Sequence, residues 1–287
     1  MPHPVTIVVD LHGAAGAEAR RAVESACAQG AQEVVAIGEA EQAPALEGLE
    51  VGAALGEATP AQARNAAVAG AAAEAVLVLG GHEWLAPDAV ARLAAALGSD
   101  ADAGAAYGKT GVHRTNDRLR VFPDAGREDS MFGHLLRDKH LVAASGALLW
   151  RRDAAPPTPY ADYCTLPALR LAHVLEVGRT GRRFAFVDDV VVERAVEALD
   201  AAAQEELIKV VVAVLFGAEP LDEELEARAR FRLARHLVAL GKLRYRAEDY
   251  DRAGRLFDEA LRSAPGYFKG RRYQFMNFVQ RTLARVD

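Results

Sequence analysis

Polar residues and glycines follow three apolar runs of the sequence, and their types suit ligand binding. They lie at Asp10–Gly13, Gly38–Ala40 and Gly80–Trp84. The loop at Gly80 and Gly81 has no side chains, which leaves its backbone amides accessible to a phosphate. His82 and Glu83 carry an imidazole and a carboxylate, which are ligand types that Mn²⁺ accepts. If the runs are parallel strands, their carboxyl ends meet at one sheet edge, where such folds bind ligands.

The runs have the composition of buried strands. Val5–Val9 and Ala75–Leu79 are continuous and apolar, as in strands covered on both faces, and Val34–Ile37 is a shorter run. Helical patterns separate them, from Ala17 to Gln29, from Pro60 onward and over Asp88–Leu97. This alternation predicts an α/β domain with a mostly parallel sheet and right-handed crossovers.

The middle of the chain is less regular. Turn signals bracket Arg118–Phe122 and predict a hairpin, and a proline-rich loop precedes a predicted helix over Thr165–Val177. The other predicted strands are Gly104–Gly108, Leu141–Trp150 with a break at Gly146, and a last strand with a kink over Phe184–Val187 and Val190–Val192. After Leu199 the pattern is helical throughout.

In this order the segments resemble the family-2 glycosyltransferases of the GT-A fold. Ser25-Ala26-Cys27-Ala28-Gln29 is similar to their S-x-x-x-Q helix end, and Ala63-Arg64-Asn65-Ala66-Ala67 to their A-R-N-x-G segment. Trp84–Ala89 (WLAPDA) resembles the W-L-x-P-D-A start of a helix. The resemblance covers about the first 195 residues. It implies a GT-A domain, a nucleotide-diphosphate sugar as donor and an inverting transfer of the sugar.

Two acidic motifs of that family are missing. Where members carry a base-reading aspartate this chain has Gly38 and Glu39, and where they carry the metal-binding D-x-D it has Gly80-Gly81-His82. The resemblance implies a reduced Mn²⁺ or Mg²⁺ site on His82 and Glu83, with a polar turn or metal-independent action as alternatives. The implied donor-binding residues are Asp10, Gly38, Glu39, Arg64, Gly80 and Gly81.

Two functional positions of the family are retained. Arg64 matches a basic residue that can face the donor diphosphate, and its guanidinium suits phosphate; a solvated surface position is the alternative. Asp162 matches the second acid of an E-D motif, the general base that deprotonates an acceptor hydroxyl, although its companion is Ala161. The alternative for Asp162 is the N-cap of the helix that starts near Thr165, or of a turn before Pro167. We expect His12, His134 and His140 to be structural.

Composition limits the remaining classes. The chain has 287 residues, 51% of them hydrophobic, no apolar run long enough to span a membrane and no signal-peptide pattern, so we expect a globular cytoplasmic protein. The net charge is −11 before Asp222 and +5 from there on, with 15 Lys and Arg against 10 Asp and Glu in the second part. The acidic larger part argues against binding nucleic acid. Cys27 and Cys164 lie in apolar patterns that predict buried thiols.

The carboxy-terminal part is predicted to be a separate helical domain. We place the boundary between a GT-A-like domain at 1–198 and the helical domain at 199–287. Within it, Ala234–Tyr267 matches one tetratricopeptide-like unit, with Leu237, Leu240, Gly241, Tyr250, Ala253, Phe257, Ala260 and Pro265 at the expected positions. A single unit cannot bury its own faces, so it must pack on neighbouring helices, on the first domain or on another subunit.

The last helix combines aromatic and basic residues. Its stripe of Phe275, Met276, Val279, Leu283 and Val286 predicts a buried face. A solvated basic face on a capping helix is one interpretation of the remaining residues. Docking on an anionic surface, either a membrane or an acidic partner, is the other.

Two functions fit this sequence. The first is a glycosyltransferase-like enzyme that takes a nucleotide-sugar donor and an acceptor that the sequence does not identify, with Asp162 as base. The second is a catalytically inactive GT-A-fold module that binds a protein partner, or a second copy of itself, through the helical tail. Loss of three family carboxylates motivates the second.

Overall fold

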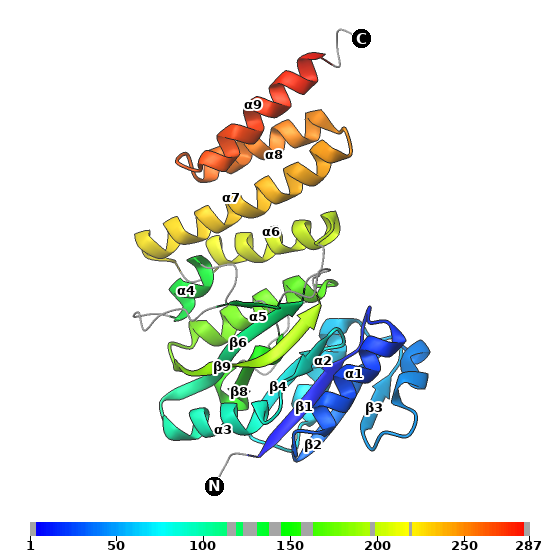
Figure 1. Ribbon diagram of the computed structural model, residues 1–287. Helices are drawn as coiled ribbons and strands as arrows, with labels where there is room; N and C mark the ends of the chain where they lie inside the picture. The colour runs from blue at the N-terminus through cyan, green and yellow to red at the C-terminus, as the bar shows by residue number, and fades with distance from the viewer. Residues whose placement is uncertain are drawn as a thin grey trace. The chain divides into compact units, whose positions relative to one another are not determined.

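The computed structural model describes residues 4–113, 119–122, 131–137, 145–155, 163–195, 199–217 and 220–283. The chain divides into two compact units, Met1–Glu197 and Ala198–Asp287 (Figure 1). No helix in the described ranges is both long and apolar enough to cross a membrane.

The first unit is built on one mixed sheet flanked by helices (Figure 1). Its strand order is β3-β2-β1-β4-β8-β6-β9-β5, and β7 pairs with β6. The strands are β1 Val5–Asp10, β2 Glu33–Gly38, β3 Gly52–Leu55, β4 Ala75–Gly80, β5 Glu83–Leu85, β6 Ala103–His113, β7 Leu119–Phe122, β8 Leu148–Arg151 and β9 Arg183–Ala195. The helices are α1 Gly16–Cys27, α2 Pro60–Gly70, α3 Ala89–Ser99, α4 Met131–Arg137 and α5 Leu166–Arg179, with short 3₁₀ turns η1 Ala40–Leu46, η2 Ser145–Ala147 and η3 Arg152–Ala154.

The two faces of β1 have different partners because side chains alternate along a strand. Ile7 and Val9 join the core cluster that includes residues of α1 and α3, such as Val23 and Leu93. Asp10 lies on the other face, where it meets Arg64 of α2. The strand therefore buries an apolar row on one face of the sheet and places the carboxylate of Asp10 on the other face.

The predicted mostly parallel sheet is only half right. Strands β1 to β4 pair in parallel, as do β6 and β9. However, β8 is antiparallel to both β4 and β6, β7 is antiparallel to β6, and β5 is antiparallel to β9. The regular alternation of strand and helix ends at α3. The prediction of a parallel sheet rested on this alternation and was extended to the later strands, which lack it.

Other differences follow from burial. The short edge strand β3 was not predicted because its sequence, GAAL, contains no β-branched or aromatic residue, and three of its four residues are exposed. The last strand, predicted with a kink over Phe184–Val187 and Val190–Val192, is the longer β9, and its register against β6 shifts near Lys109. Cys27 and Cys164 are exposed, contrary to the prediction of buried thiols.

The second unit is a series of helices in which each packs on the next along the chain. They are α6 Ala201–Leu215, α7 Glu223–Arg246, α8 Tyr250–Ser263 and α9 Phe268–Leu283. The close approach of α7 and α8 depends on Gly241, which faces the fully buried ring of Phe257. The side chain of Asp249 caps α8 by accepting from the amide of Arg252 at 3.1 Å.

One expectation about α9 is wrong. Phe275, Met276 and Val279, predicted to lie on a buried face, are exposed. The helix instead buries Gly270 and Asn277 against its neighbours. The predicted stripe extends to Leu283 and Val286, whose side chains lie outside the described part of the chain.

Replacing Gly241 by alanine is expected to lower the free energy of unfolding by about 1–3 kcal/mol, because an added Cβ overpacks the helix contact. This Cβ would lie 2.5–3.0 Å from three ring atoms of Phe257, which has no exposed surface into which it could move. Urea denaturation followed by circular dichroism measures the change. Gly266→Ala is the matched control, since a Cβ there meets no atom within 4 Å. Equal stability of the two variants would contradict the expectation.

Candidate functional site at the carboxyl ends of β1, β2 and β4

The three strand ends that the sequence singled out meet at one sheet edge. Asp10 is aligned with Ile37 of β2 on one side and with Gly80 of β4 on the other. Gly38 and Glu39 follow Ile37 directly, and Glu39 is exposed. The structure thus brings together most of the predicted donor-binding residues, and it buries several of them.

A buried charge cluster lies at the end of β1. Arg64 reaches from α2 so that its Nε lies 2.5 Å from Oδ2 of Asp10, and the two side chains are 1% and 0% exposed. His12 places its Nδ1 2.6 Å from Oδ1 of Asp10, and its backbone amide donates to the same oxygen at 3.0 Å. Arg64 is therefore not a solvated surface residue. His12 was expected to be structural, yet it belongs to this cluster; its signal in the sequence is its position two residues after an aspartate that ends a buried strand.

The cluster carries net positive charge when His12 is protonated. Burial on its own raises the pKa of Asp10, but Arg64 and His12 more than offset this and hold the pKa below its ordinary value. Burial lowers the pKa of His12, whereas its hydrogen bond to Asp10 and the charge there raise it, and the net direction is upward. With His12 protonated, two cationic groups on one carboxylate leave one positive charge at the strand edge, and with His12 neutral the charges of Arg64 and Asp10 balance.

Glycines at this edge create space that other groups fill. A Cβ on Gly38 would collide with Oε1 of Gln42. That amide group holds the end of β2, since Gln42 donates to the Leu11 carbonyl and accepts from the Glu39 amide at 2.9 Å. An aspartate at position 38 would therefore displace Gln42.

Gly80 and Gly81 are closely packed as well. A Cβ on Gly80 would lie 3.2 Å from Cδ of Glu83, and one on Gly81 would lie 2.5 Å from Cβ of Ala14. Both glycines are buried. A larger side chain at position 80 would press on Glu83, and one at position 81 would have to displace Ala14.

Glu83 is bound by the protein's own donors. Its Oε2 accepts from the amides of Gly80 at 3.1 Å and Gly146 at 2.9 Å, and Nη2 of Arg170 lies 3.2 Å from its Oε1. Burial raises its pKa, but Arg170 leads a set of neighbours that bring the pKa below its ordinary value. The side chain is fully buried, so both carboxylate oxygens bind groups inside the protein core.

The residues here do not fit a divalent cation. Across the described ranges no three His, Cys, Asp or Glu side chains are grouped so that they could hold a metal ion. His82 is partly exposed, but its expected companion Glu83 is engaged as described above. The predicted metal site on these two residues therefore has no support in the geometry.

Asp162 and Ala161 lie outside the described residues. Helix α5 begins at Leu166, and Thr165 is its N-cap residue. The catalytic role of Asp162 stays a prediction.

A small enclosed cavity adjoins the charge cluster. It is lined by Arg64, Val78, Leu148, Trp150, Arg170, His173 and Val174. It therefore borders both buried ion pairs, Asp10–Arg64 and Glu83–Arg170. Sequence reasoning missed Arg170 and His173; their signal is a pair of basic residues three positions apart in an otherwise apolar segment of α5.

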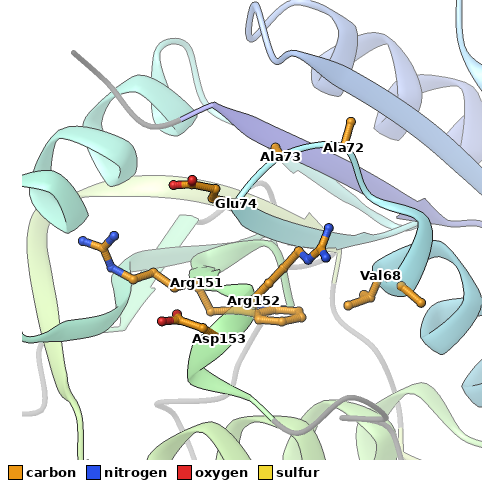
Figure 2. Close-up of a pocket in the computed structure, with 9 residues that line it drawn as sticks. Val68, Ala72, Ala73, Glu74, Arg151, Arg152 and Asp153 are labelled. Atoms are coloured by element: carbon orange, nitrogen blue, oxygen red, sulfur yellow. The ribbon is translucent and has the colours of Figure 1, made fainter.

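A larger pocket, of about 830 Å³, lies at the opposite sheet edge. Figure 2 shows Glu74, just before β4, near Arg151, Arg152 and Asp153 at the end of β8. Arg151 donates to the carbonyls of Ala103 and Leu97, Arg152 to that of Ala71, and Asp153 pairs with Arg182. None of the predicted site residues lines this pocket.

Comparison with known proteins supports the fold assignment. No protein-family model and no curated protein matches the sequence. Solved structures do match. Residues 1–349 of S. aureus TarS align with 99% of this chain and 92% of that one, at 14% identity and a TM-score of 0.61. The same fragment in complex with UDP-GlcNAc aligns with 96% of this chain and 89% of that one, at 13% identity and a TM-score of 0.61.

A third structure extends the range of similar proteins. The mannosyltransferase PcManGT from Pyrobaculum calidifontis, solved with GDP-Man and Mn²⁺, aligns with 96% of this chain and 84% of that one, at 16% identity and a TM-score of 0.53. The class defined by these similarities is the GT-A glycosyltransferase fold. Identities of this size establish the fold alone.

Proposed function

We propose that this protein is a glycosyltransferase that uses a nucleotide-diphosphate sugar. The observation that carries the proposal is the similarity, over nearly the whole chain, to a transferase fold whose relatives were solved with UDP-GlcNAc and with GDP-Man and Mn²⁺. In this proposal the donor lies at the carboxyl ends of β1, β2 and β4, where parallel sheets of this kind bind ligands. Asp162 deprotonates the acceptor hydroxyl.

The cluster of Asp10, His12 and Arg64 supports donor binding in a domain that is otherwise acidic. A donor diphosphate needs positive charge close to its oxygens as the nucleotide leaves. When His12 is protonated, the cluster has one positive charge in excess, and its Asp10 is aligned with Gly80 at the strand end where the family holds its metal. The proposal contains no step through a metal ion, because the donor set for one is incomplete.

Calorimetric titration with UDP-GlcNAc, GDP-mannose and related donors, with and without Mn²⁺, tests donor binding. The proposal predicts binding of at least one donor; failure of every donor to bind a folded sample would reject it. A requirement for Mn²⁺ would show that the charge cluster does not replace the cation.

The role of Asp162 is tested through hydrolysis of the bound donor, measured as release of nucleoside diphosphate with water as acceptor. Asp162→Asn is expected to slow this release at least about 100-fold while leaving donor affinity unchanged. The matched control is Asp153→Asn, which changes a carboxylate that pairs with Arg182 at the surface. Equal rates in both variants would remove Asp162 from the mechanism.

The alternative function is a catalytically inactive module that binds a partner through its helical unit. The observation that favours it is the close packing around Gly38, Gly80 and Gly81, where a carboxylate side chain would have to displace Gln42, Glu83 or Ala14. It predicts no donor binding, and it predicts a partner whose capture is lost when the chain is truncated from Asp222.

A further inference from the structure

Helix α9 presents an apolar face to solvent. Phe268 and Phe275 are 74% and 69% exposed, and Met276 and Val279 are 36% and 38% exposed. Phe268, Phe275 and Val279 are spaced by seven and four residues, which places them on one side of the helix. Exposed aromatic residues in a contiguous row are typical of interaction surfaces.

The opposite face fixes the helix in place. Asn277 is 4% exposed and donates to the backbone carbonyl of Tyr250 at 2.9 Å. Gln274 donates to Asp258 of α8 at 2.5 Å, and Tyr273 stacks on Phe257 with ring centroids 5.8 Å apart. The aromatic row therefore belongs to an anchored helix, and it needs no rearrangement to meet a partner.

The charged residues of α9 are all basic. Between Phe268 and Leu283 the sequence has four basic residues and no acidic one. Lys269, Arg271 and Arg272 are exposed, and Arg271 also donates to the Pro265 carbonyl at 3.0 Å. An apolar row on a helix that carries cations and no acidic residue is complementary to a surface that is apolar beneath a negatively charged layer.

We propose that α9 docks this face on an anionic lipid membrane, with its phenylalanine side chains inserted at the level of the headgroups and its cations on the anionic lipids. A second copy of the chain fits less well. A two-fold contact through the same face brings each copy's Arg271 and Arg272 toward the other copy's basic row, and no acidic residue of α9 offsets them. The proposal is independent of whether the first unit transfers a sugar.

The test is cosedimentation of the full chain with large vesicles, either of phosphatidylcholine alone or of phosphatidylcholine and phosphatidylglycerol in a seven-to-three ratio. We expect binding to the anionic vesicles and little to the neutral ones. Phe268→Ser with Phe275→Ser is expected to weaken this binding about tenfold or more, since both rings lose their contact with lipid. Lys269→Glu with Arg272→Glu is expected to weaken it similarly and to reduce its salt dependence.

The matched control is Phe216→Ser, which removes an aromatic ring of equal exposure, 72%, from the end of α6. It should leave vesicle binding unchanged. Circular dichroism establishes that all variants are folded, and light scattering gives their oligomeric state. The proposal is overturned if the chain ignores anionic vesicles, if Phe216→Ser weakens binding as much as the α9 variants do, or if the α9 variants dissociate a dimer without changing vesicle binding.

Discussion

Replacing Glu83 by glutamine is expected to lower the free energy of unfolding by about 3–5 kcal/mol, because it leaves the Arg170 guanidinium buried without its counter-charge. Both side chains are almost fully buried, at 0% and 5% exposure, and no solvent screens the loss. Glutamine keeps the size of the side chain, so the change isolates charge from packing. Chemical denaturation at neutral pH measures the difference.

The pH dependence identifies the ion pair as the cause. The pKa of Glu83 is lowered from its ordinary value of 4.5, so the carboxylate stabilises the folded state above pH 4.5. That contribution is lost as the pH falls through the lower pKa of the folded state. The difference between the native chain and Glu83→Gln should therefore be full at neutral pH and shrink below pH 4.5, because a protonated glutamic acid resembles glutamine.

An exposed carboxylate in a comparable pair provides the control. Glu24 lies 2.8 Å from Nε of Arg20 on α1, and both side chains are about half exposed. Glu24→Gln should change stability by no more than about 0.5 kcal/mol, as surface pairs usually do. If Glu83→Gln behaves like this control but abolishes Mn²⁺-dependent donor binding, Glu83 is a metal ligand and its assignment to the core is wrong.

The sequence could predict the elements whose signal is local. The buried runs at Val5–Val9 and Ala75–Leu79 lie within strands β1 and β4, and the helix predicted over Asp88–Leu97 largely coincides with α3. Such runs are visible because a strand covered on both faces is apolar at every position. Strand β3 (GAAL) has three exposed residues out of four and no β-branched or aromatic residue, so its sequence does not distinguish it from a loop or a helix.

The sequence predicts where the candidate site lies, but it does not predict which of its side chains contact one another. Strand ends locate Asp10, Gly38 and Gly80 at one edge because parallel strands share their direction. No sequence pattern shows that Arg64, 54 positions from Asp10, forms a buried pair with it. The same holds for Glu83 and Arg170, since an acidic residue after a strand has the same pattern whether it faces a cation in a cleft or an arginine in the core.

The second large effect is expected at Asp10. Asp10→Asn should cost about 3–5 kcal/mol of stability, because it leaves the charge of Arg64 buried and unbalanced. It should also lower the pKa of His12, which the hydrogen bond and charge of Asp10 raise. Because the pKa of His12 is raised in the folded state, the protonated ring stabilises the fold. This contribution to stability is complete below the ordinary pKa of 6.5, and it is lost as the pH rises through the raised pKa. NMR titration of the His12 ring measures the pKa change directly.

A double-mutant cycle separates the ion pair from its surroundings. Arg64→Met alone should also destabilise the chain by about 3–5 kcal/mol, because it leaves Asp10 buried with only His12 as a partner. The double variant should lose less than the sum of the two single losses by about 1–3 kcal/mol, since neither buried charge then remains. Strict additivity would mean that Asp10 and Arg64 act separately. In that case the stability lost in Arg64→Met comes from another contact of Arg64. The free energy of donor binding should then fall by more than the free energy of unfolding.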